Sequence, residues 1–401
     1  MTPWKKTFIS AFTAQILSIV GFSFALPFLP FFIADLGVPD AGDQAFWAGL
    51  VLSAAGLTFA LSAPFWGIAA DRYGRKLMVC RAMFGGTAVL LLMSYVQTVG
   101  QLLVCRLLQG AFTGTMAASV ALVASVVPRK RSGLTLGMMQ TAVFIGTTVG
   151  PFFGGLMADS FGYRASFRMG ALLCLAGGLL VYFGTREDFS SPAAGKEGKT
   201  SGFLSIFMLK GFFLAVLVMF AVRFNNTMIN PSFPLIVRDI LPSAEKINSI
   251  TGSVMASAAL AGAFSAALVG YVGDQYGHRR VLFGCCLLAA AASAGHFWAM
   301  SINQLFAARV LFGLAVAGML PAANAMIHGI IDHNSLGKAY GLATSLSMLG
   351  TAAGPFAGGY LASSAGLRMP FLVTAGTQLA LGVLILLCMR QSGGIKQSQS
   401  R

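Results

Sequence analysis

Twelve apolar runs, each long enough to cross a lipid bilayer as a helix, follow one another along this sequence. A helix needs about 20 mostly apolar residues to span the hydrocarbon core. Backbone hydrogen bonds in lipid must be satisfied within the segment or by a closed barrel, so runs of this length predict helices. The runs cover residues 7–35, 45–70, 77–95, 101–127, 133–158, 166–184, 204–236, 248–272, 281–300, 303–330, 338–362 and 369–390.

The composition excludes a soluble globular protein. Hydrophobic residues make up 56% of the 401 residues, charged residues only 10%, and the mean hydropathy is +0.77. A soluble domain carries about 25% charged residues, because water must wet its surface. The sequence therefore predicts an all-α polytopic membrane protein with 12 transmembrane helices.

The formal net charge of +15 would suggest nucleic acid binding in a soluble protein, but here it follows the membrane topology. Of the 27 lysines and arginines, 19 fall in segments on the side of the N-terminus, five on the other side and three within spans. Lysine and arginine favour cytoplasmic loops. We therefore predict a protein of the cytoplasmic (inner) membrane with both termini in the cytoplasm and no nucleic acid partner.

The two halves of the chain match at a nearly constant offset. Asp71 and Arg106 meet Asp274 and Arg309 at an offset of 203, and Gly150-Pro151 meets Gly354-Pro355 at 204. Six helices per half place both repeats in the same orientation, with a symmetry axis along the membrane normal. We predict two parallel six-helix bundles, at residues 1–185 and 204–401, joined by a polar cytoplasmic linker at 186–203.

The loop after the second run carries an acid, basic residues and paired glycines at fixed spacing, namely Gly67, Asp71, Arg72, Gly74, Arg75 and Lys76. It resembles the signature loop of the major facilitator superfamily, G-x-x-x-D-R-x-G-R-R, and the resemblance extends over all twelve runs. The resemblance implies that Asp71 belongs to a cytoplasmic latch, which joins the halves when the cavity faces outward. The second copy contains Asp274, Gly277 and Arg279, but Gln275 replaces its first arginine, so we expect a weaker latch.

The fourth run contains Arg106, Gln109 and Gly110, which resemble a second motif of this superfamily. An arginine inside the bilayer costs several kcal/mol unless it faces a cavity or a partner. We expect Arg106 to act in the cavity, together with the other two span arginines, Arg223 and Arg309.

The fifth run contains glycines at helical spacing beside a proline, namely Gly146, Gly150, Pro151, Gly154 and Gly155. Such glycines allow helices to approach closely. The pattern G-x-x-x-G-P-x-x-G-G is similar to the antiporter motif of the 12-helix drug:proton antiporter branch, most like carriers of the MdtG type.

None of the twelve acids falls at the middle of a run, unlike the buried carboxylate of many cation exporters. The spans offer arginines and amides instead, which favours neutral or anionic substrates over lipophilic cations. The candidate substrate contacts are Gln15, Gln140, Asn225, Asn226, Asn230 and Asn324.

These features predict a secondary active transporter that exports amphiphilic small molecules by alternating access, with proton-antiport multidrug efflux as the leading interpretation. We expect no cofactor or metal, a proton gradient as energy source, the lipid bilayer as surroundings and a monomer. The alternatives are an exporter of a siderophore or sugar-like anion and, from another class, a non-transporting receptor or a lipid scramblase. An enzyme is not expected, because no nucleophile–base pair is apparent.

Overall fold

The computed structural model describes residues 3–128, 131–187, 210–328 and 336–398, and these residues form helices joined by short turns. The first half contains α1 (Pro3–Ala25), η1 (Leu26–Phe28), α2 (Leu29–Asp35), α3 (Ala41–Tyr73), α4 (Arg75–Met93), α5 (Val99–Phe112), α6 (Thr115–Val126), α7 (Ser132–Phe161) and α8 (Tyr163–Gly184). The second half contains α10 (Lys210–Met228), α11 (Phe233–Ile240), α12 (Ile247–Tyr276), α13 (His278–Trp298), α14 (Ile302–Ala317), α15 (Met319–His328), α16 (Leu336–Ala365) and α17 (Met369–Ser398).

Among the described residues, eleven helical segments are long and apolar enough to cross a membrane. The remaining predicted run corresponds to α16, a 30-residue helix rich in glycine, alanine, serine and threonine. It packs against both α3 and α10, so small residues replace the bulky apolar ones that lipid would favour. The prediction of an all-α polytopic membrane fold is confirmed.

Four of the predicted spans are interrupted, at corresponding places in the two halves. The first span changes from α1 through the 3₁₀ turn η1 to α2, where Pro27 and Pro30 remove backbone donors, and the seventh changes from α10 to α11. The fourth span breaks between α5 and α6 at Gly114, whose φ of +117° is accessible to glycine at little cost. The tenth span breaks at the corresponding place, between α14 and α15, where Gly318 keeps a right-handed backbone with φ of −80°.

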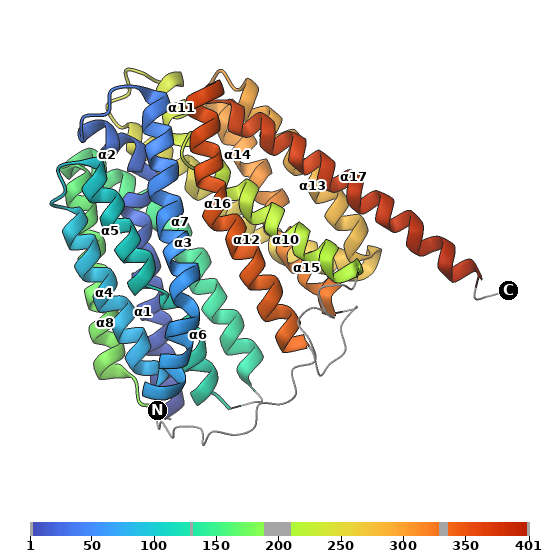
Figure 1. Ribbon diagram of the computed structural model, residues 1–401, viewed down its shortest axis with the longest axis horizontal. Coiled ribbons are helices and arrows are strands. Elements are labelled where there is room, and N and C mark those ends of the chain that lie inside the picture. The colour runs from blue at the N-terminus through green and yellow to red at the C-terminus, as the bar shows by residue number, and fades with distance from the viewer. Residues whose placement is uncertain (1–2, 129–130, 188–209, 329–335, 399–401) are drawn as a thin grey trace.

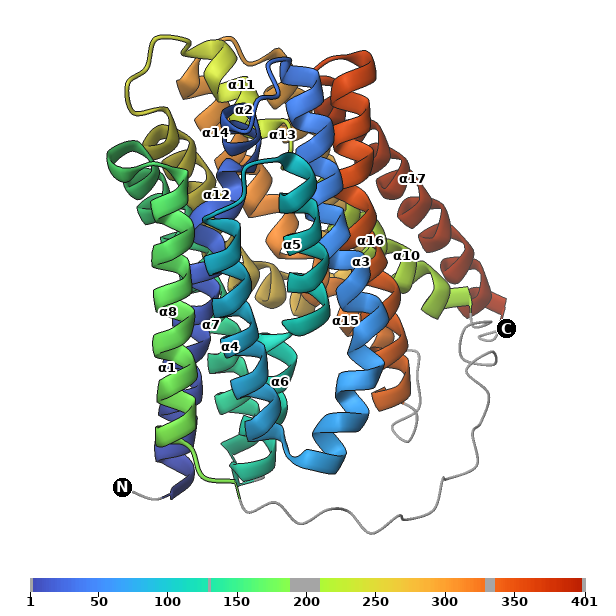
Figure 2. The same ribbon diagram turned by 60° about the vertical axis from the view of Figure 1, so that its left-hand side comes forward.

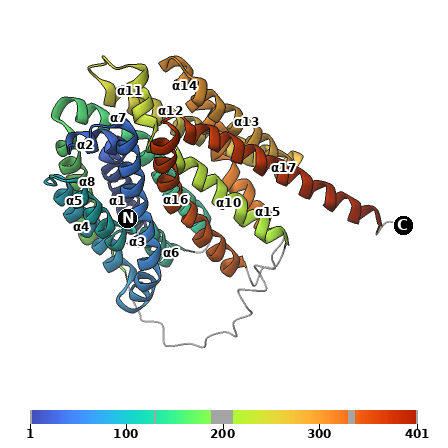
Figure 3. The same ribbon diagram turned by 45° about the horizontal axis from the view of Figure 1, so that its top comes forward.

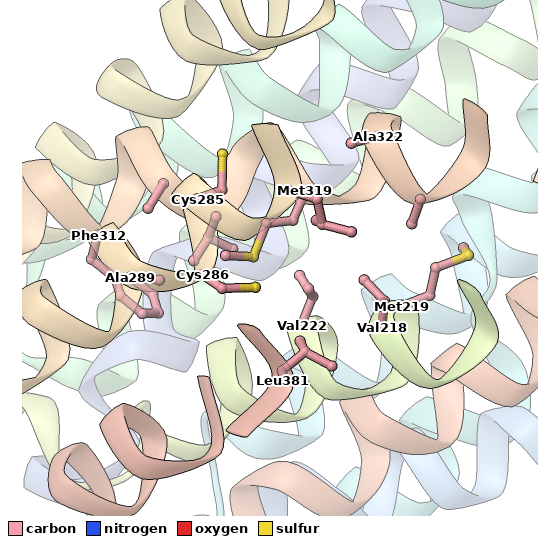
Figure 4. Close-up of a cluster of buried hydrophobic side chains, with 14 of the residues drawn as sticks. Val218, Met219, Val222, Cys285, Cys286, Ala289, Phe312, Met319, Ala322 and Leu381 are labelled. Atoms are coloured by element: carbon pink, nitrogen blue, oxygen red, sulfur yellow. The ribbon is translucent and has the colours of Figure 1, made fainter. Parts of the chain in front are cut away.

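Each half has an apolar core of its own. In the second half, side chains from α10, α13, α14, α15 and α17 form one large buried cluster, part of which is drawn in Figure 4. In the first half, smaller clusters connect α1 with α3, α4, α5 and α8. Each half therefore has a core formed by its own helices, as expected for two bundles joined by a linker. The boundaries of the bundles, at residues 185 and 204, stay a prediction, and residue 204 lies outside the described residues.

The halves approach each other at one end and diverge toward the other (Figure 1). We call the end that carries α2 and α11 the far end, and the end that carries residues 3 and 187 the linker end. Two helix pairs form the contact between the halves, α3 with α16 and α7 with α12 (Figures 2 and 3). A small apolar cluster at the far end contains Phe28, Phe31 and Ala45 of the first half with Leu235 and Ala362 of the second.

Candidate functional site

A cavity of about 330 Å³ lies between the two halves, and both halves line it. The first half contributes residues of α1, α3 and α5, and the second contributes residues of α10 and α16. The lining residues are Phe22, Leu52, Ala55, Gly56, Phe59, Arg106, Gln109, Gly110, Thr113, Thr227, Asn230, Thr351 and Pro355. An apolar wall with a few convergent polar groups is the usual composition of a small-molecule site.

Arg106 supplies the charge of this cavity. Its side chain is only 5% exposed, Nε donates to the carbonyl oxygen of Val51 at 3.2 Å, and Nη1 donates to Oε1 of Gln109, one turn along α5. Both acceptors are neutral, and no acid is among the cavity-lining residues of the described chain. The cation is therefore positioned without being neutralised, so it can attract a negative charge.

Gly110 allows α5 to approach α3 closely enough to place Arg106 there. A Cβ at this position would overlap the side chain of Thr58 and the carbonyl oxygen of Ala55. The predicted trio of Arg106, Gln109 and Gly110 thus lies together at the cavity wall.

Arg309 lies elsewhere, contrary to the expectation that it faces the cavity. It is 6% exposed inside the second half, with its guanidinium 4.5 Å from the ring centroid of Phe233 and 5.9 Å from that of Phe312. The reason is the exchange of Gln109 for Phe312 in the repeat, which offers an aromatic face in place of a carbonyl. Arg223, on α10, is half-buried and does not line the cavity either.

Of the six candidate contacts, the structure brings only Asn230 to the cavity. Gln15 and Asn225 are both 0% exposed within their own halves, and Asn225 accepts a hydrogen bond from Thr377 of α17 at 2.9 Å. Gln140 and Asn226 are exposed, and Asn324 is half-buried on α15. The sequence indicates depth in a span but not which side of the helix meets the other half, so these five positions differ from the prediction.

Asp159 joins the halves at the far end. Its carboxylate accepts hydrogen bonds from the backbone and side chain of Asn248, at 3.2 and 2.8 Å, and from the backbone N–H of Ser249 at 2.7 Å and the Ser249 hydroxyl. Tyr163 donates to Oδ1 of Asn248 at 3.3 Å. A carboxylate from the first half thus occupies the N-terminus of α12, where unpaired N–H groups and the helix dipole stabilise negative charge.

The glycines of the antiporter motif serve two different contacts. A Cβ at Gly146, Gly150 or Gly154 would meet α1 of the same half, whereas a Cβ at Gly155 would overlap the carbonyl oxygen of Asn248 in the other half. Pro151 lies inside α7, and its carbonyl oxygen faces Gly252 of α12. The motif therefore packs α7 within its bundle and also lets the halves close.

The second copy repeats this arrangement between α16 and α3. A Cβ at Gly359 would overlap the carbonyl oxygen of Ala45, and a Cβ at Gly49 would overlap that of Pro355. Close contacts on both sides of the far end thus seal this end in the present conformation.

At the linker end, the two acids of the predicted latch, Asp71 and Asp274, form no hydrogen bond or ion pair with the other half among the described residues. Asp71 is exposed, and no described residue forms a hydrogen bond or ion pair with it. Asp274 pairs with His278 of its own half at 3.4 Å. Gly74 and Gly277 have φ of +94° and +91°, so both copies need glycine for the turn between helices. Gly67 and Arg72 belong to the exposed end of α3, and Arg279 is half-buried at the start of α13.

Glu187 and Thr185, for which the sequence predicted no role, hold this end of the first half. The Glu187 carboxylate accepts from the backbone N–H groups of Arg75 and Lys76 at 3.0 and 2.7 Å, while Lys76 Nζ donates to the Thr185 carbonyl oxygen at 2.7 Å. Arg81 lies in the second turn of α4, with its guanidinium carbon 3.5 Å from the ring centroid of Trp66. The one signal in the sequence for Glu187 is its position, an acidic residue three positions after the end of the predicted span 166–184.

Comparison with known proteins agrees with this arrangement. The family model of the Major Facilitator Superfamily matches residues 11–224 and 215–399. The multi-drug resistance efflux pump PmrA of Streptococcus pneumoniae is 34% identical over 382 residues, with 93% of both chains covered. The multidrug resistance protein MdtG of Citrobacter koseri is 32% identical over 381 residues, covering 94% of this chain and 93% of the relative.

Among solved structures, a bacterial homolog of the human lysosomal transporter Spinster, in an inward-facing and occupied conformation, matches with a TM-score of 0.79. The match covers 97% of this chain and 98% of that one, at 16% sequence identity. At this identity the likeness concerns the fold.

Proposed function

The chain belongs to the major facilitator superfamily, and we propose that it exports amphiphilic small molecules from the cell by alternating access, in exchange for protons. The observation that carries the proposal is a cavity lined by both halves, with the contacts between these halves gathered at one end. Multidrug efflux relatives that match over more than nine-tenths of the chain support export, and proton exchange rests on the antiporter motif of α7.

We assign the linker end to the cytoplasm, so that both termini lie inside and the carrier resides in the inner membrane as a monomer. The excess of lysine and arginine in segments at that end supports this orientation. The two halves, with boundaries at residues 185 and 204, would then move as units about the cavity. In the present conformation the far end is closed, so the cavity would load from the cytoplasm.

The charge of the cavity supports a preference for neutral and anionic compounds. Two unit charges 4 Å apart interact by about 4 kcal/mol at an effective dielectric constant of 20. Arg106 is held by neutral acceptors only, and its field would therefore repel a cation that enters the cavity.

The test is transport by the purified protein in liposomes under an imposed pH gradient, with both substrate and proton movement recorded. The panel contains matched neutral, anionic and quaternary cationic amphiphiles. We expect gradient-driven movement of neutral and anionic members that stops when the gradient is collapsed, and little movement of ethidium.

A matched control is Arg223→Ala, which removes an arginine from α10 that does not line the cavity. This variant should keep the charge preference of the unmodified protein. Absence of gradient-driven movement for every panel member would contradict proton-coupled export, and robust ethidium export would contradict the charge preference.

A further inference from the structure

The break in the fourth span leaves backbone carbonyl groups without helical partners at the wall of the cavity. α5 ends at Phe112 and α6 begins at Thr115, and the last four carbonyl groups of a helix have no N–H partner within that helix. Gly110 and Thr113, which lie at this break, both line the cavity. Whatever binds these carbonyl groups therefore also determines where the cavity wall lies.

Side chains from two other helices bind these carbonyl groups. Nε1 of Trp66 on α3 donates to the carbonyl oxygen of Ala111 at 2.7 Å, and Nη2 of Arg81 on α4 donates to that of Thr113 at 3.4 Å. The guanidinium carbon of Arg81 lies 3.5 Å from the centroid of the Trp66 ring, a distance at which the cation stacks on the aromatic face. We call this pair the Trp66–Arg81 clamp.

The clamp is built on a helical hairpin. Trp66 lies eight residues before Gly74, the turn between α3 and α4, and Arg81 lies seven residues after it. The turn therefore brings the two side chains to the same level. α3 and α4 both pack against α5, and α4 also packs against α6, as Figure 2 shows. The hairpin thus holds the break from two helices at once.

The surroundings of Arg81 indicate that its charge is stabilised by this break rather than by an acid. Its Nε and Nη1 atoms are buried and form no hydrogen bond with a described residue, and no described acid forms an ion pair with it. The carbonyl end of a helix carries partial negative charge, and an aromatic face also attracts a cation. The end of α5 and the Trp66 ring supply both.

The second half lacks the clamp, although its tenth span is interrupted at the corresponding place. With the repeat offset of 203, Val269 and Gly284 stand where the first half has Trp66 and Arg81. Neither residue has a side-chain donor. The clamp is therefore a feature of the first half and not of the duplicated fold.

A serine near the break is common to both halves. The Ser62 hydroxyl donates to the carbonyl oxygen of Gly110 at 3.5 Å, and its repeat mate Ser265 donates to that of Leu314. An interrupted span therefore does not require the clamp. The cavity, however, is lined by three residues of α5 and, within the described chain, by none of α14. The clamp thus occurs in the half whose interrupted helix forms the cavity wall.

We propose that Trp66 and Arg81 are positioning residues of the cavity, which act through the last turn of α5. The clamp holds this turn against α3 and α4 and so fixes the place of Gln109, Gly110 and Thr113 in the wall. Gln109 in turn accepts a hydrogen bond from the cavity arginine, so the orientation of that cation depends on the same turn. The effect on transport rests on the proposed function, whereas the position of α5 does not.

The first test is hydrogen exchange of backbone amides, measured by mass spectrometry on the purified full-length protein in detergent. Arg81→Gln and Trp66→Ala should raise the exchange rate in residues 106–118 by about 10-fold, because the turn that loses its partner frays. The corresponding residues 309–321 of the second half should be unchanged. Arg223→Gln, which removes a half-buried arginine of α10, is the control and should leave both segments unchanged.

A milder variant covers the case in which Trp66→Ala does not fold. Trp66→Phe retains an aromatic ring for the guanidinium but lacks the indole N–H, so the exchange rate should rise less, and in the same segment. An unchanged rate in Arg81→Gln and Trp66→Phe, or an equal rise along the whole chain, would overturn the proposal.

The second test is uptake of radiolabelled taurocholate, an anionic amphiphile, into inverted membrane vesicles. Arg81→Gln should raise KM by about 10-fold with little change in Vmax per amount of protein, because the displaced turn alters the cavity and not the number of active carriers. Arg81→Lys, which retains the charge and a donor, should recover most of the affinity. A role in folding alone would lower Vmax and leave KM unchanged, and that result would overturn the proposal.

The two tests separate this proposal from the proposed export. If the unmodified protein transports no taurocholate, the exchange measurement alone decides whether the clamp positions the cavity wall. If no member of the transport panel moves either, export is contradicted, and faster exchange confined to residues 106–118 would still support the clamp.

Discussion

At the scale of single residues, Arg106 determines the electrostatics of the cavity. Arg106→Ala should reduce export of anionic and neutral compounds by about 10- to 100-fold, because it removes a buried charge-assisted contact. Arg106→Lys should restore only part of the activity, since an ammonium group lacks the planar fork of guanidinium. Uptake into inverted vesicles measures both, with protein level as the reference; unchanged export by Arg106→Ala would refute this role.

Asp159 should control closure of the far end. Asp159→Asn removes the charge that α12 stabilises at its N-terminus, so the equilibrium should shift by about 10-fold toward an open far end. Spin labels at Phe161 and Glu245, both exposed and on opposite halves, would report a longer distance. Asp43→Asn is the control, because the exposed Asp43 carboxylate at the far end forms no hydrogen bond or ion pair with a described residue. An unchanged distance distribution in Asp159→Asn would exclude the role.

Some of these residues were predictable and others were not. The spacing of Arg106 and Gln109, one helical turn apart, places the amide beside the guanidinium whichever way the helix faces. Gln15 and Asn225 depended on the rotation of α1 and α10. In a membrane bundle both faces of a helix are apolar, so the sequence carries little signal for that rotation.

At the scale of helices, the spans were predicted well but their interruptions were not. A hydropathy window averages over a break of one or two residues, as at Gly114 between α5 and α6 or at Gly318 between α14 and α15. Only the interruption after α1 coincides with prolines, Pro27 and Pro30, which lack backbone donors, and the sequence analysis did not use this signal.

The structure separates two roles within the antiporter motif. Gly154→Leu should force α7 away from α1 of the same bundle, so both expression and export should fall. Gly155→Leu should leave the bundle folded and block closure against α12, so export should be lost at a normal expression level.

Fluorescence-detected size exclusion and transport measure these outcomes side by side. Gly137→Leu, on the same helix with open space around its Cα, is the matched control and should resemble the unmodified protein. Normal coupled export in Gly155→Leu would mean that the close approach of α7 and α12 is dispensable.

At the scale of the whole molecule, the duplication and its offset predicted two parallel six-helix bundles, but not that α3 meets α16 and α7 meets α12 between the halves. The conformation could not be predicted, since the same sequence must form contacts at either end in turn. The present contacts belong to the far end, through Asp159 and the two glycine pairs, whereas among the described residues Asp71 and Asp274 form no hydrogen bond or ion pair with the other half.

The latch should therefore matter only in the opposite conformation. Asp71 is exposed and forms no hydrogen bond or ion pair with a described residue here. Asp71→Asn should therefore leave the stability of this state unchanged and still reduce export strongly, because it destabilises the conformation closed at the linker end. Asp274→Asn should have a milder effect, since Gln275 replaces the first arginine of that copy. Thermal unfolding and vesicle transport measured on the same preparations distinguish the two effects. If both variants export normally, or if Asp71→Asn also lowers the stability of the present state, Asp71 does not act as a conformation-specific latch.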